Sequence, residues 1–363
     1  MPAAETAVIV IEDDPFLRVM QVVLDPNTSA ERFEAFADFF SHDEPDFAGY
    51  CAQVRARAPG LFPAEVRLVD TQDELREAIG DATAVVLESL ALGPEEIAAA
   101  PRLKAVQKYG VGLRHIDTDA CVERGIKVLT IRRRANIACA EHVIGLMLAQ
   151  AKMTKRLMGR ISPEALAEIG LPYRLFDRRH TPNSNWPRIR GVRMLQDATL
   201  GIIGFGEIGR EIALRANVFG MRVLYFQRTP LPQPQERQLR IAYAPLHTLL
   251  AESDWVVPQL PSGPALKDLI GRAELARMKP GAFIVNVSRP DVVNRAALID
   301  ALKSGRLGGF ALDPQYETPG RADDELLTFD NVILTPHIAA QPRFNALSDC
   351  AEMVEVLARE IAA

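Results

Sequence analysis

Three glycines at a regular spacing form the most informative pattern in this sequence. Gly204, Gly206 and Gly209 follow the apolar run 199–203 and precede a helix-forming run. Gly204 permits a tight turn between strand and helix, and Gly206 removes the side chain where the backbone would meet a phosphate. Gly209 lets the helix pack closely on the strand, while the helix N-terminus supplies unpaired N–H groups and a positive dipole end. The pattern predicts a binding site for the pyrophosphate of a dinucleotide.

The elements that must position this turn alternate between strands and helices. Short β-rich runs predict strands at 7–11, 66–69, 84–87, 103–106, 126–129, 199–203, 221–226, 255–257, 283–287 and 332–335. Helices are expected at 71–79, 93–99 and, with apolar residues nearly all round, 136–153. Such alternation favours parallel sheets covered by helices. We therefore predict an α/β fold of two Rossmann-like domains with parallel sheets.

The end of the chain suggests how the domains are ordered. Residues 347–361 place their apolar side chains on one helical face, so a helix after the last strand could cross back onto the first domain. We therefore expect a substrate domain made of residues 1–155 and 341–363, with an NAD(P)-binding domain at 156–340 inserted into it. Residues 156–190 are expected to form an irregular, exposed connector, because they are rich in proline and arginine.

An aromatic segment lies within residues 31–60. Phe33, Phe36 and Phe40 recur there at helical spacing among acidic residues. The favoured interpretation is an amphipathic helix that packs the three rings inward, and the alternative is a surface for a partner or a lid.

Composition excludes several classes of function. The chain has 363 residues and a net charge of -5, so it lacks the basic surface of a nucleic-acid-binding protein. Its four cysteines are scattered without a C-x-x-C pair, which is typical of reduced thiols in a cytosolic protein. No secretory signal and no apolar run long enough to span a bilayer are seen. We expect a cytoplasmic protein with no nucleic-acid or membrane partner.

Four further blocks of residues occur in a definite order around the glycine turn. One block lies before the turn and comprises residues 110–112, 116–117, 124–128 and 140–142. The other three lie after the turn, at 278–289, 309–313 and 331–340. Together with the turn, these blocks resemble the D-isomer-specific 2-hydroxyacid dehydrogenase family, whose superfamily also holds formate, phosphoglycerate and phosphite dehydrogenases. The resemblance covers the chain from about Leu103 to its end. It implies hydride transfer between NAD(P)H and a 2-oxo acid to give a D-2-hydroxy acid, by a homodimer with a flavodoxin-like substrate domain.

The resemblance also implies roles for single residues. Arg289 occupies the position of the arginine that binds the substrate carboxylate and polarises the ketone, and His337 occupies that of the proton donor. Val111 and Gly112 match the loop whose N–H groups receive the carboxylate, and Asp313 resembles the residue that anchors the nicotinamide carboxamide. Beside the three glycines, the implied cofactor contacts are Phe205, Glu207, Ile208, Pro261 and Val287.

The segment that should supply a partner for the histidine departs from the family. Relatives carry a glutamate just before a proline, and a carboxylate beside a histidine keeps the acid protonated. Here that position holds Thr318, with Glu317 one residue earlier. Three explanations stay open: Glu317 swings in, His337 works without a carboxylate, or the chemistry is not ordinary ketone reduction. Both Glu317 and Thr318 are therefore candidate catalytic residues.

Three adjacent arginines, Arg132, Arg133 and Arg134, stand where relatives carry a Pro-Gly turn near the substrate loop. Such a run is usually a solvated surface. The alternative is that one of them binds a second anionic group of a dicarboxylate, a phosphorylated acid or the cofactor, and Arg134 is the residue assigned to the substrate site. No metal site is predicted, because His115 and the nearby aspartates have no further ligand cluster to join them.

The end of the second strand of the nucleotide-binding domain bears on the choice of cofactor. Enzymes that prefer NAD place an acidic residue there, which accepts a hydrogen bond from the ribose 2′-hydroxyl. Here Gln227 stands at that position and Arg228 follows it. We expect NADP or NAD, with NADP favoured, because the carboxylate that would repel a 2′-phosphate is missing.

Two other functions stay open at this point. One is oxidation of a different small substrate, as in the formate and phosphite branches, which the missing glutamate motivates. The other is a nucleotide-sensing binding protein with vestigial chemistry, against which the presence of both Arg289 and His337 argues.

Overall fold

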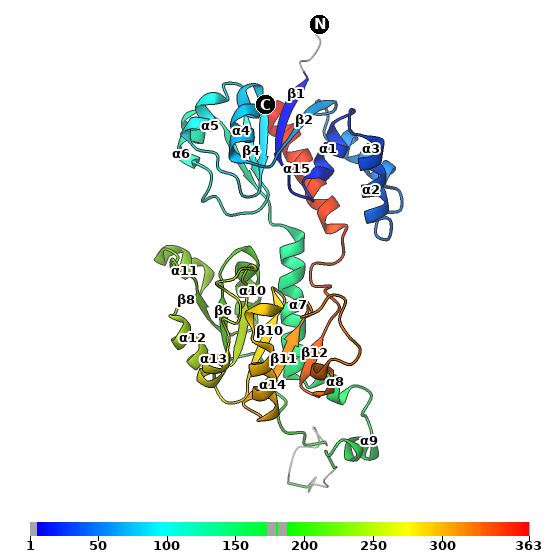
Figure 1. Cartoon of the computed structure of the whole chain (residues 1–363), viewed down its shortest axis with the longest axis vertical. Helices are drawn as coiled ribbons and strands as arrows, with labels where there is room; N and C mark the ends of the chain where they lie inside the picture. Colours follow the sequence, from blue (N-terminus) through cyan, green and yellow to red (C-terminus); the bar gives the residue numbers. More distant parts are fainter. Residues whose placement is uncertain (1–5, 173–178, 181–186, 363) are drawn as a thin grey trace. The chain divides into compact units, whose positions relative to one another are not determined.

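The computed structural model describes residues 6–172, 179–180 and 187–362. The chain divides into two compact units, Met1–Ile137 with Ala340–Ala363 and Ala138–Ala339. In each unit the strands form one sheet with helices around it (Figure 1). All strand pairs in both sheets are parallel. This confirms the expected α/β fold class.

The first unit contains a five-stranded sheet. Its strands are β1 (Ala7–Glu12), β2 (Ala64–Val69), β3 (Ala84–Leu87), β4 (Ala105–Lys108) and β5 (Lys127–Thr130), in the order β2-β1-β3-β4-β5. This is the flavodoxin-like order. Every residue of β3 and β4 is buried, as expected for strands covered on both faces. The helices are α1 (Arg18–Leu24), α2 (Ala30–Phe40), α3 (Phe47–Arg57), α4 (Gln72–Ala78), α5 (Pro94–Ala99), α6 (Thr118–Glu123) and α15 (Asn345–Ala362).

The C-terminal helix α15 belongs to the core of the first unit. Leu347, Val354 and Leu357 are buried in the same apolar cluster as Ile9 and Ile11 of β1. Together with the buried Cys350 these residues recur every three to four positions, so one face of α15 is buried along most of its length. The last segment of the chain therefore packs beside the first.

The aromatic segment contains two helices, α2 and α3, and the three phenylalanines at helical spacing all lie in α2. Ser29 ends the preceding turn and its side chain accepts a hydrogen bond from the N–H of Arg32, which caps α2. Phe40 is fully buried and Phe33 and Phe36 pack against the same core, so the rings point inward as expected.

The second unit contains a seven-stranded sheet. Its strands are β6 (Thr199–Ile203), β7 (Arg222–Phe226), β8 (Ala242–Tyr243), β9 (Trp255–Pro258), β10 (Ala282–Asn286), β11 (Leu307–Leu312) and β12 (Val332–Leu334), in the order β12-β11-β10-β9-β6-β7-β8. Strand order reverses between β6 and β9, and ligands bind beyond the carboxyl ends of the strands at such a point. The sequence patterns had not marked β8 or β11 as strands.

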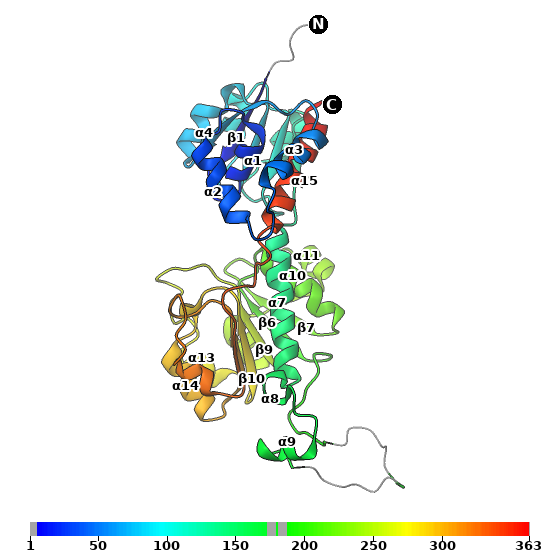
Figure 2. The same cartoon turned by 90° about the vertical axis from the view of Figure 1, so that its right-hand side faces the viewer.

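Helices cover both faces of this second sheet. They are α7 (Arg134–Ala151), α10 (Glu207–Val218), α11 (Gln233–Leu239), α12 (Leu246–Glu252), α13 (Arg272–Arg277) and α14 (Arg295–Lys303). Figure 2 shows α10 and α11 on one side of the sheet and α13 and α14 on the other. The two apolar clusters of the unit follow the same division, because α7 and α10 contribute to one and α12 to α14 contribute to the other.

The two units divide inside α7, between residues 137 and 138, rather than after this helix as the expected boundary at 155 placed it. The physical reason is packing, because Val143 and Met147 of α7 lie in one apolar cluster with Leu200 and Ile202 of β6. The second junction, at residues 339 and 340, differs by one residue from the expected one.

The expected connector, residues 156–190, is only partly irregular. It contains α9 (Pro163–Glu168), whose cap Ser162 accepts a hydrogen bond from the N–H of Ala165 at 3.2 Å. A shorter helix, α8 (Thr154–Leu157), precedes it. Residues 173–178 and 181–186 of the connector lie outside the described residues.

Candidate functional site

The glycine turn connects β6 to α10 and each glycine has its own structural reason. Gly204 has a φ of +90°, and a Cβ at this position would lie 2.2 Å from the carbonyl oxygen of Gln259. A Cβ on Gly209 would lie 2.9 Å from the carbonyl oxygen of Gly204. Gly206, by contrast, would meet no atom within 4 Å. Gly204 and Gly209 are therefore required by the fold, whereas Gly206 keeps a space open in front of α10.

The residues around this turn fit a bound dinucleotide. Gly206 is the N-cap of α10, and no side chain caps the helix, so its first N–H groups face the open space. Next to the turn, the Nε2 atom of Gln259 is buried without a hydrogen-bond partner. A buried donor of this kind is rare in the absence of a ligand or water. The site therefore has both an anion-binding helix end and a donor that lacks an acceptor.

The neighbouring residues of the turn differ in which of their atoms are accessible. Phe205 is buried in the core, with its ring centroid 4.7 Å from that of Tyr225, so only its backbone is available. Ile208 is half-buried against the same core. Glu207 is the first residue of α10, where a carboxylate favours the helix dipole.

The position that distinguishes NAD from NADP lies directly after β7. The Nε2 of Gln227 donates to the carbonyl oxygen of Thr229 at 2.6 Å. Arg228 is exposed, and we find no hydrogen bond or ion pair for it within the described part of the chain. Arg228 is therefore a cation without a partner in the described residues, and it lies next to Gln227, which has no carboxylate.

Arg289 follows β10 in a turn shaped by Asn286, which is fully buried. The side-chain oxygen of Asn286 accepts hydrogen bonds from the N–H and hydroxyl of Ser288, both at 2.9 Å. Its amide donates to the carbonyl oxygen of Arg289 at 2.7 Å. These bonds hold the backbone on both sides of Val287 and leave the Arg289 side chain exposed. Pro261 is likewise exposed after β9, whereas Val287 is buried.

Asp313 follows β11 and holds the segment after β12. Its carbonyl oxygen accepts from the N–H of His337 at 3.0 Å. Its carboxylate accepts from the N–H groups of Ile338 at 2.9 Å and Ala339 at 2.8 Å. Three successive backbone N–H groups are thus bound to one residue, and His337 adopts a left-handed backbone with a φ of +57°.

A histidine and a threonine complete the environment of this carboxylate. The hydroxyl of Thr335 donates to Asp313 at 2.6 Å, and the Nε2 of His142 lies 3.1 Å from Thr335 Oγ1 and 3.5 Å from Asp313 Oδ1. Burial acts to raise the pKa of Asp313, but the hydrogen bonds from His142, Thr335, Ile338 and Ala339 outweigh it and lower the pKa to about 2. Asp313 is therefore a carboxylate at any ordinary pH.

The structure places Arg289, Asp313 and His337 after three adjacent parallel strands, β10, β11 and β12, so that they share one sheet edge. The same edge carries the glycine turn and Gln227. Backbone hydrogen bonds connect the three segments, from Asp313 to Asn286 and from Thr335 to Leu312, each 3.0 Å long. The candidate residues of the second unit therefore gather in one region.

Glu317 and Thr318, the two residues proposed as the partner of His337, stay predictions. The His337 side chain is exposed, and neither Glu317 nor Thr318 forms a hydrogen bond with it in the residues that the structure describes. Glu317 instead lines a cavity of about 420 Å³ together with Arg295 and Arg321. Gln315 contacts the segment that precedes His337, because its amide donates to the carbonyl oxygens of Asp313, at 2.7 Å, and of Thr335.

In the first unit, the Gly110–Gly112 loop directly follows Tyr109 at the carboxyl end of β4. Gly110 has a φ of +139° and accepts a hydrogen bond at its carbonyl from the N–H of Ile131 at 3.0 Å. Val111 is 38% exposed, and Gly112 is exposed beside it. The loop is therefore accessible and tied to the segment that carries the three arginines.

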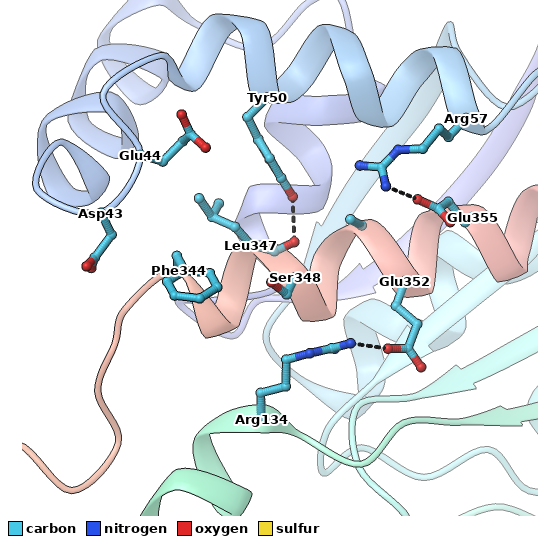
Figure 3. Close-up of a pocket in the computed structure, with 11 residues that line it drawn as sticks. Asp43, Glu44, Tyr50, Arg57, Arg134, Phe344, Leu347, Ser348, Glu352 and Glu355 are labelled. Carbon is cyan, nitrogen blue, oxygen red and sulfur yellow. Dashed lines mark hydrogen bonds and ion pairs between the residues drawn. The ribbon is translucent and has the colours of Figure 1, made fainter.

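Arg134 is engaged within the first unit. Its guanidinium donates to Asp349 at 2.7 Å, and its backbone N–H also donates to Asp349. The guanidinium also donates to Glu352 at 2.8 Å (Figure 3). Two acidic residues of α15 thus neutralise this arginine, and we do not retain its assignment to the substrate site. It lines a cavity of about 580 Å³ whose other arginine, Arg57, is paired with Glu355 at 3.0 Å.

A sheet in the doubly wound order with an uncapped glycine turn at its switch point defines a dinucleotide-binding α/β protein. The family model for the NAD-binding domain of D-isomer specific 2-hydroxyacid dehydrogenases matches residues 175–339. A glyoxylate reductase of Pyrococcus furiosus is 36% identical over 284 residues, which cover 78% of this chain and 80% of the relative. A hydroxypyruvate reductase of Thermotoga maritima is 32% identical over 294 residues, 80% of this chain and 88% of the relative.

The chain therefore belongs to the D-isomer-specific 2-hydroxyacid dehydrogenase family, and it is an oxidoreductase of the class that acts on CH–OH groups with a nicotinamide cofactor. The apo structure of D-mandelate dehydrogenase from Rhodotorula graminis has the same fold, with a TM-score of 0.56 and 23% identity over 97% of this chain and 93% of that one. The family and the enzyme class expected from the sequence are confirmed.

The sequence predicts neither a membrane-spanning helix nor a metal site, and both predictions can be compared only with the residues that the structure describes. In that part of the chain, no helix is long and apolar enough to cross a membrane. Within the same ranges, no group of three or more histidine, cysteine, aspartate or glutamate side chains is arranged to hold a metal ion.

Sequence reasoning missed His142, Thr335, Gln315 and Gln259. His142 and Thr335 both lay inside blocks that carried the family resemblance, which was a usable signal. Gln315 and Gln259 had no such signal, because an isolated glutamine after a strand is indistinguishable from a surface residue.

Proposed function

We propose that this enzyme reduces a 2-oxo acid to a D-2-hydroxy acid, with Arg289 binding and polarising the substrate and His337 donating the proton. The observation that supports the proposal is the shared sheet edge of Arg289, Asp313 and His337. Asp313 binds three successive N–H groups around His337 and so holds the proton donor in one backbone conformation.

The residue chemistry suits this reaction. A reduced nicotinamide bound at the glycine turn would supply the hydride for the carbonyl carbon. The guanidinium of Arg289 has the geometry to hold the carboxylate and keto oxygens together, and its charge stabilises the oxygen as negative charge develops there. The His337 imidazole gives its proton to that oxygen. The N–H groups of Val111 and Gly112 receive the carboxylate, as the resemblance implies.

The finer assignments belong to the same proposal. NADP is the favoured cofactor, because Gln227 replaces the acidic residue and Arg228 is exposed without a partner in the described ranges. We also propose a homodimer that works in the cytoplasm. Asp313 remains our candidate for the nicotinamide anchor, in addition to its hold on the His337 segment.

The first experiment is the consumption of NADPH and NADH with glyoxylate, pyruvate, hydroxypyruvate, phenylpyruvate and 2-oxoglutarate. In the same assay, Arg289→Ala should lose about 10²–10³-fold in kcat/KM while nucleotide binding is kept. Arg359→Ala, which removes an exposed arginine of α15, is the control for loss of one positive charge. Unchanged turnover in Arg289→Ala would contradict the role of Arg289.

A second candidate reaction is favoured by one observation. No carboxylate is hydrogen-bonded to His337 among the described residues, and the formate branch also lacks the glutamate. Oxidation of formate or phosphite with NAD(P)+ is therefore included as a separate assay. Activity there without reduction of any 2-oxo acid would replace the main proposal.

A further inference from the structure

Arg133 differs from its neighbour Arg134 in how its charge is used. Its guanidinium lies 4.0 Å from the centroid of the Tyr109 ring, and its side chain is 20% exposed. The Nε atom of Arg133 is buried and has no hydrogen-bond partner. Because buried donors normally find an acceptor, this arginine is only partly satisfied by the protein.

The place of Arg133 in the fold is the edge at which ligands bind. It follows β5, whereas Tyr109 follows β4 and Glu88 follows β3, so the three residues lie at the carboxyl ends of adjacent parallel strands. The hydrogen bond from Ile131 to Gly110 ties this segment to the loop that we assign to the substrate carboxylate. Arg133 is thus a cation beside that loop.

Glu88 holds Arg133 loosely, and a second carboxylate, that of Asp349, interacts with Arg133 through its charge while it is hydrogen-bonded to Arg134. Glu88 Oε1 lies 3.8 Å from an Arg133 Nη atom, which is an ion pair beyond hydrogen-bond distance. The Glu88 side chain is 36% exposed and can turn to solvent. A ligand anion with two oxygens in line with the guanidinium would make shorter, charge-assisted hydrogen bonds in its place.

Two further groups support an anion here. The Tyr109 ring, which is buried, orients the guanidinium plane by stacking. Lys108 is a second buried cation, and its Nζ donates to the carbonyl oxygens of Glu88, at 2.5 Å, and Tyr109, at 3.0 Å. The edge therefore carries two cations, Arg133 and Lys108, beside the carboxylate of Glu12, which is held by backbone N–H groups, and that of Glu88, which is displaceable.

We propose that Arg133 binds a second anionic group of the substrate, so that the preferred 2-oxo acid carries a carboxylate or phosphate on its side chain. The inference rests on the proposed function, because it takes the Gly110–Gly112 loop as the site of the first carboxylate. It names the substrate class that the reaction favours.

The test compares kcat/KM for matched substrates in the wild type and in Arg133→Met. The substrates with two anionic groups, called dianions below, are 2-oxoglutarate and 3-phosphohydroxypyruvate, which separate carboxylate from the more highly charged phosphate. The monoanion of similar length is 2-oxohexanoate. The wild type should favour one dianion by about tenfold or more, mainly through KM. Arg133→Met should abolish this preference and change the monoanion by less than about twofold.

Glu88→Gln supplies a change in the opposite direction. Removal of the competing carboxylate should raise kcat/KM for the dianion, whereas the double variant Glu88→Gln with Arg133→Met should behave like Arg133→Met alone. Arg359→Met is the matched control and should leave the substrate preference unchanged. Arg133→Lys keeps the charge without the fork and should restore part of the preference.

A second readout does not depend on Arg133→Met folding well. Glutarate has no keto group, and its inhibition constant against any accepted 2-oxo acid should rise in Arg133→Lys. A wild type that prefers the monoanion, or an equal loss for monoanion and dianion in Arg133→Met, overturns the inference. Absence of turnover with every 2-oxo acid is a distinct result, because it overturns the proposed function itself.

Discussion

The carbonyl oxygen of Asp313 accepts a hydrogen bond from the backbone N–H of His337, with a distance of 3.0 Å between oxygen and nitrogen. The Asp313 carboxylate binds the next two N–H groups as well, so the left-handed conformation of His337 is fixed by its neighbours. A non-glycine residue in this conformation costs about 1 kcal/mol or more. The residue to which we assign proton transfer therefore keeps its orientation through Asp313.

The low pKa of Asp313 predicts a pH dependence of stability. Because the folded-state pKa, about 2, lies below the ordinary value of 3.8, this group stabilises the fold above pH 4 and the stabilisation is lost as the pH falls towards 2. The wild type should lose about 1 kcal/mol more than Asp313→Asn between pH 5.5 and pH 3. Urea denaturation at the two pH values measures this difference. Parallel curves for the two proteins would contradict it.

The glycines predict two separable effects. Gly206→Val should fold with an unchanged melting temperature and lose dinucleotide binding, because its side chain enters the open space in front of α10. Gly204→Ala should destabilise the fold by about 2–4 kcal/mol, because its Cβ would collide with the carbonyl of Gln259 at positive φ. Differential scanning calorimetry and fluorescence titration with NADPH measure the two effects. A destabilised Gly206→Val would show that this space is not open.

Cofactor preference should depend on Gln227. Gln227→Asp restores a carboxylate that repels a 2′-phosphate and accepts from a 2′-hydroxyl, so the ratio of kcat/KM for NADPH to that for NADH should fall by about tenfold or more. Arg222→Ala, at the opposite end of β7, is the control for a charge change on the same strand. An unchanged ratio in Gln227→Asp would remove the basis for favouring NADP.

The histidine partner can be tested by restoring the carboxylate. Thr318→Glu should move the alkaline limb of the pH profile for reduction upward by about one pH unit, because a nearby carboxylate favours the protonated imidazole. Glu317→Gln should leave the profile unchanged, since Glu317 faces Arg295 and Arg321. A shift in Glu317→Gln instead would show that this offset carboxylate serves His337.

Arg134 should matter for stability and not for substrate binding. Asp349 is 1% exposed, and burial raises its pKa in spite of the hydrogen bonds from Arg134. Arg134→Met leaves this carboxylate unpaired and should cost about 2 kcal/mol, less than for a fully buried pair because Arg134 is 38% exposed. The double variant with Asp349→Asn should recover most of that loss, and KM should be unchanged throughout. A raised KM would return Arg134 to the substrate site.

Local patterns were sufficient to predict part of this molecule. The glycine turn and most strands depend on residues close together in sequence, and alternation of strands and helices indicated the fold class. The blocks around Arg289, Asp313 and His337 then indicated the family. Prediction was weakest at β8, which has only two residues, and at β11, where Gly308 and Gly309 weaken the strand pattern.

Contacts between distant segments explain the remaining errors. Arg134 and Asp349 are separated by 215 positions, and His142 and Thr335 by 193. No periodicity links such pairs, so the sequence could not show that Arg134 is neutralised or that His142 lies beside Asp313. The boundary inside α7 was missed for the same reason, because it depends on which sheet the helix packs against.

The uncapped start of α10 also has a consequence for the lifetime of the protein. A Ser, Thr, Asp or Asn at the N-cap satisfies N–H groups of the first turn with its side chain, whereas Gly206 cannot and leaves these groups to the ligand. A ligand that binds only the folded state adds RT ln(1 + [L]/Kd) to its stability. The supply of nucleotide would then set how much of this enzyme survives proteolysis, as well as how fast it works.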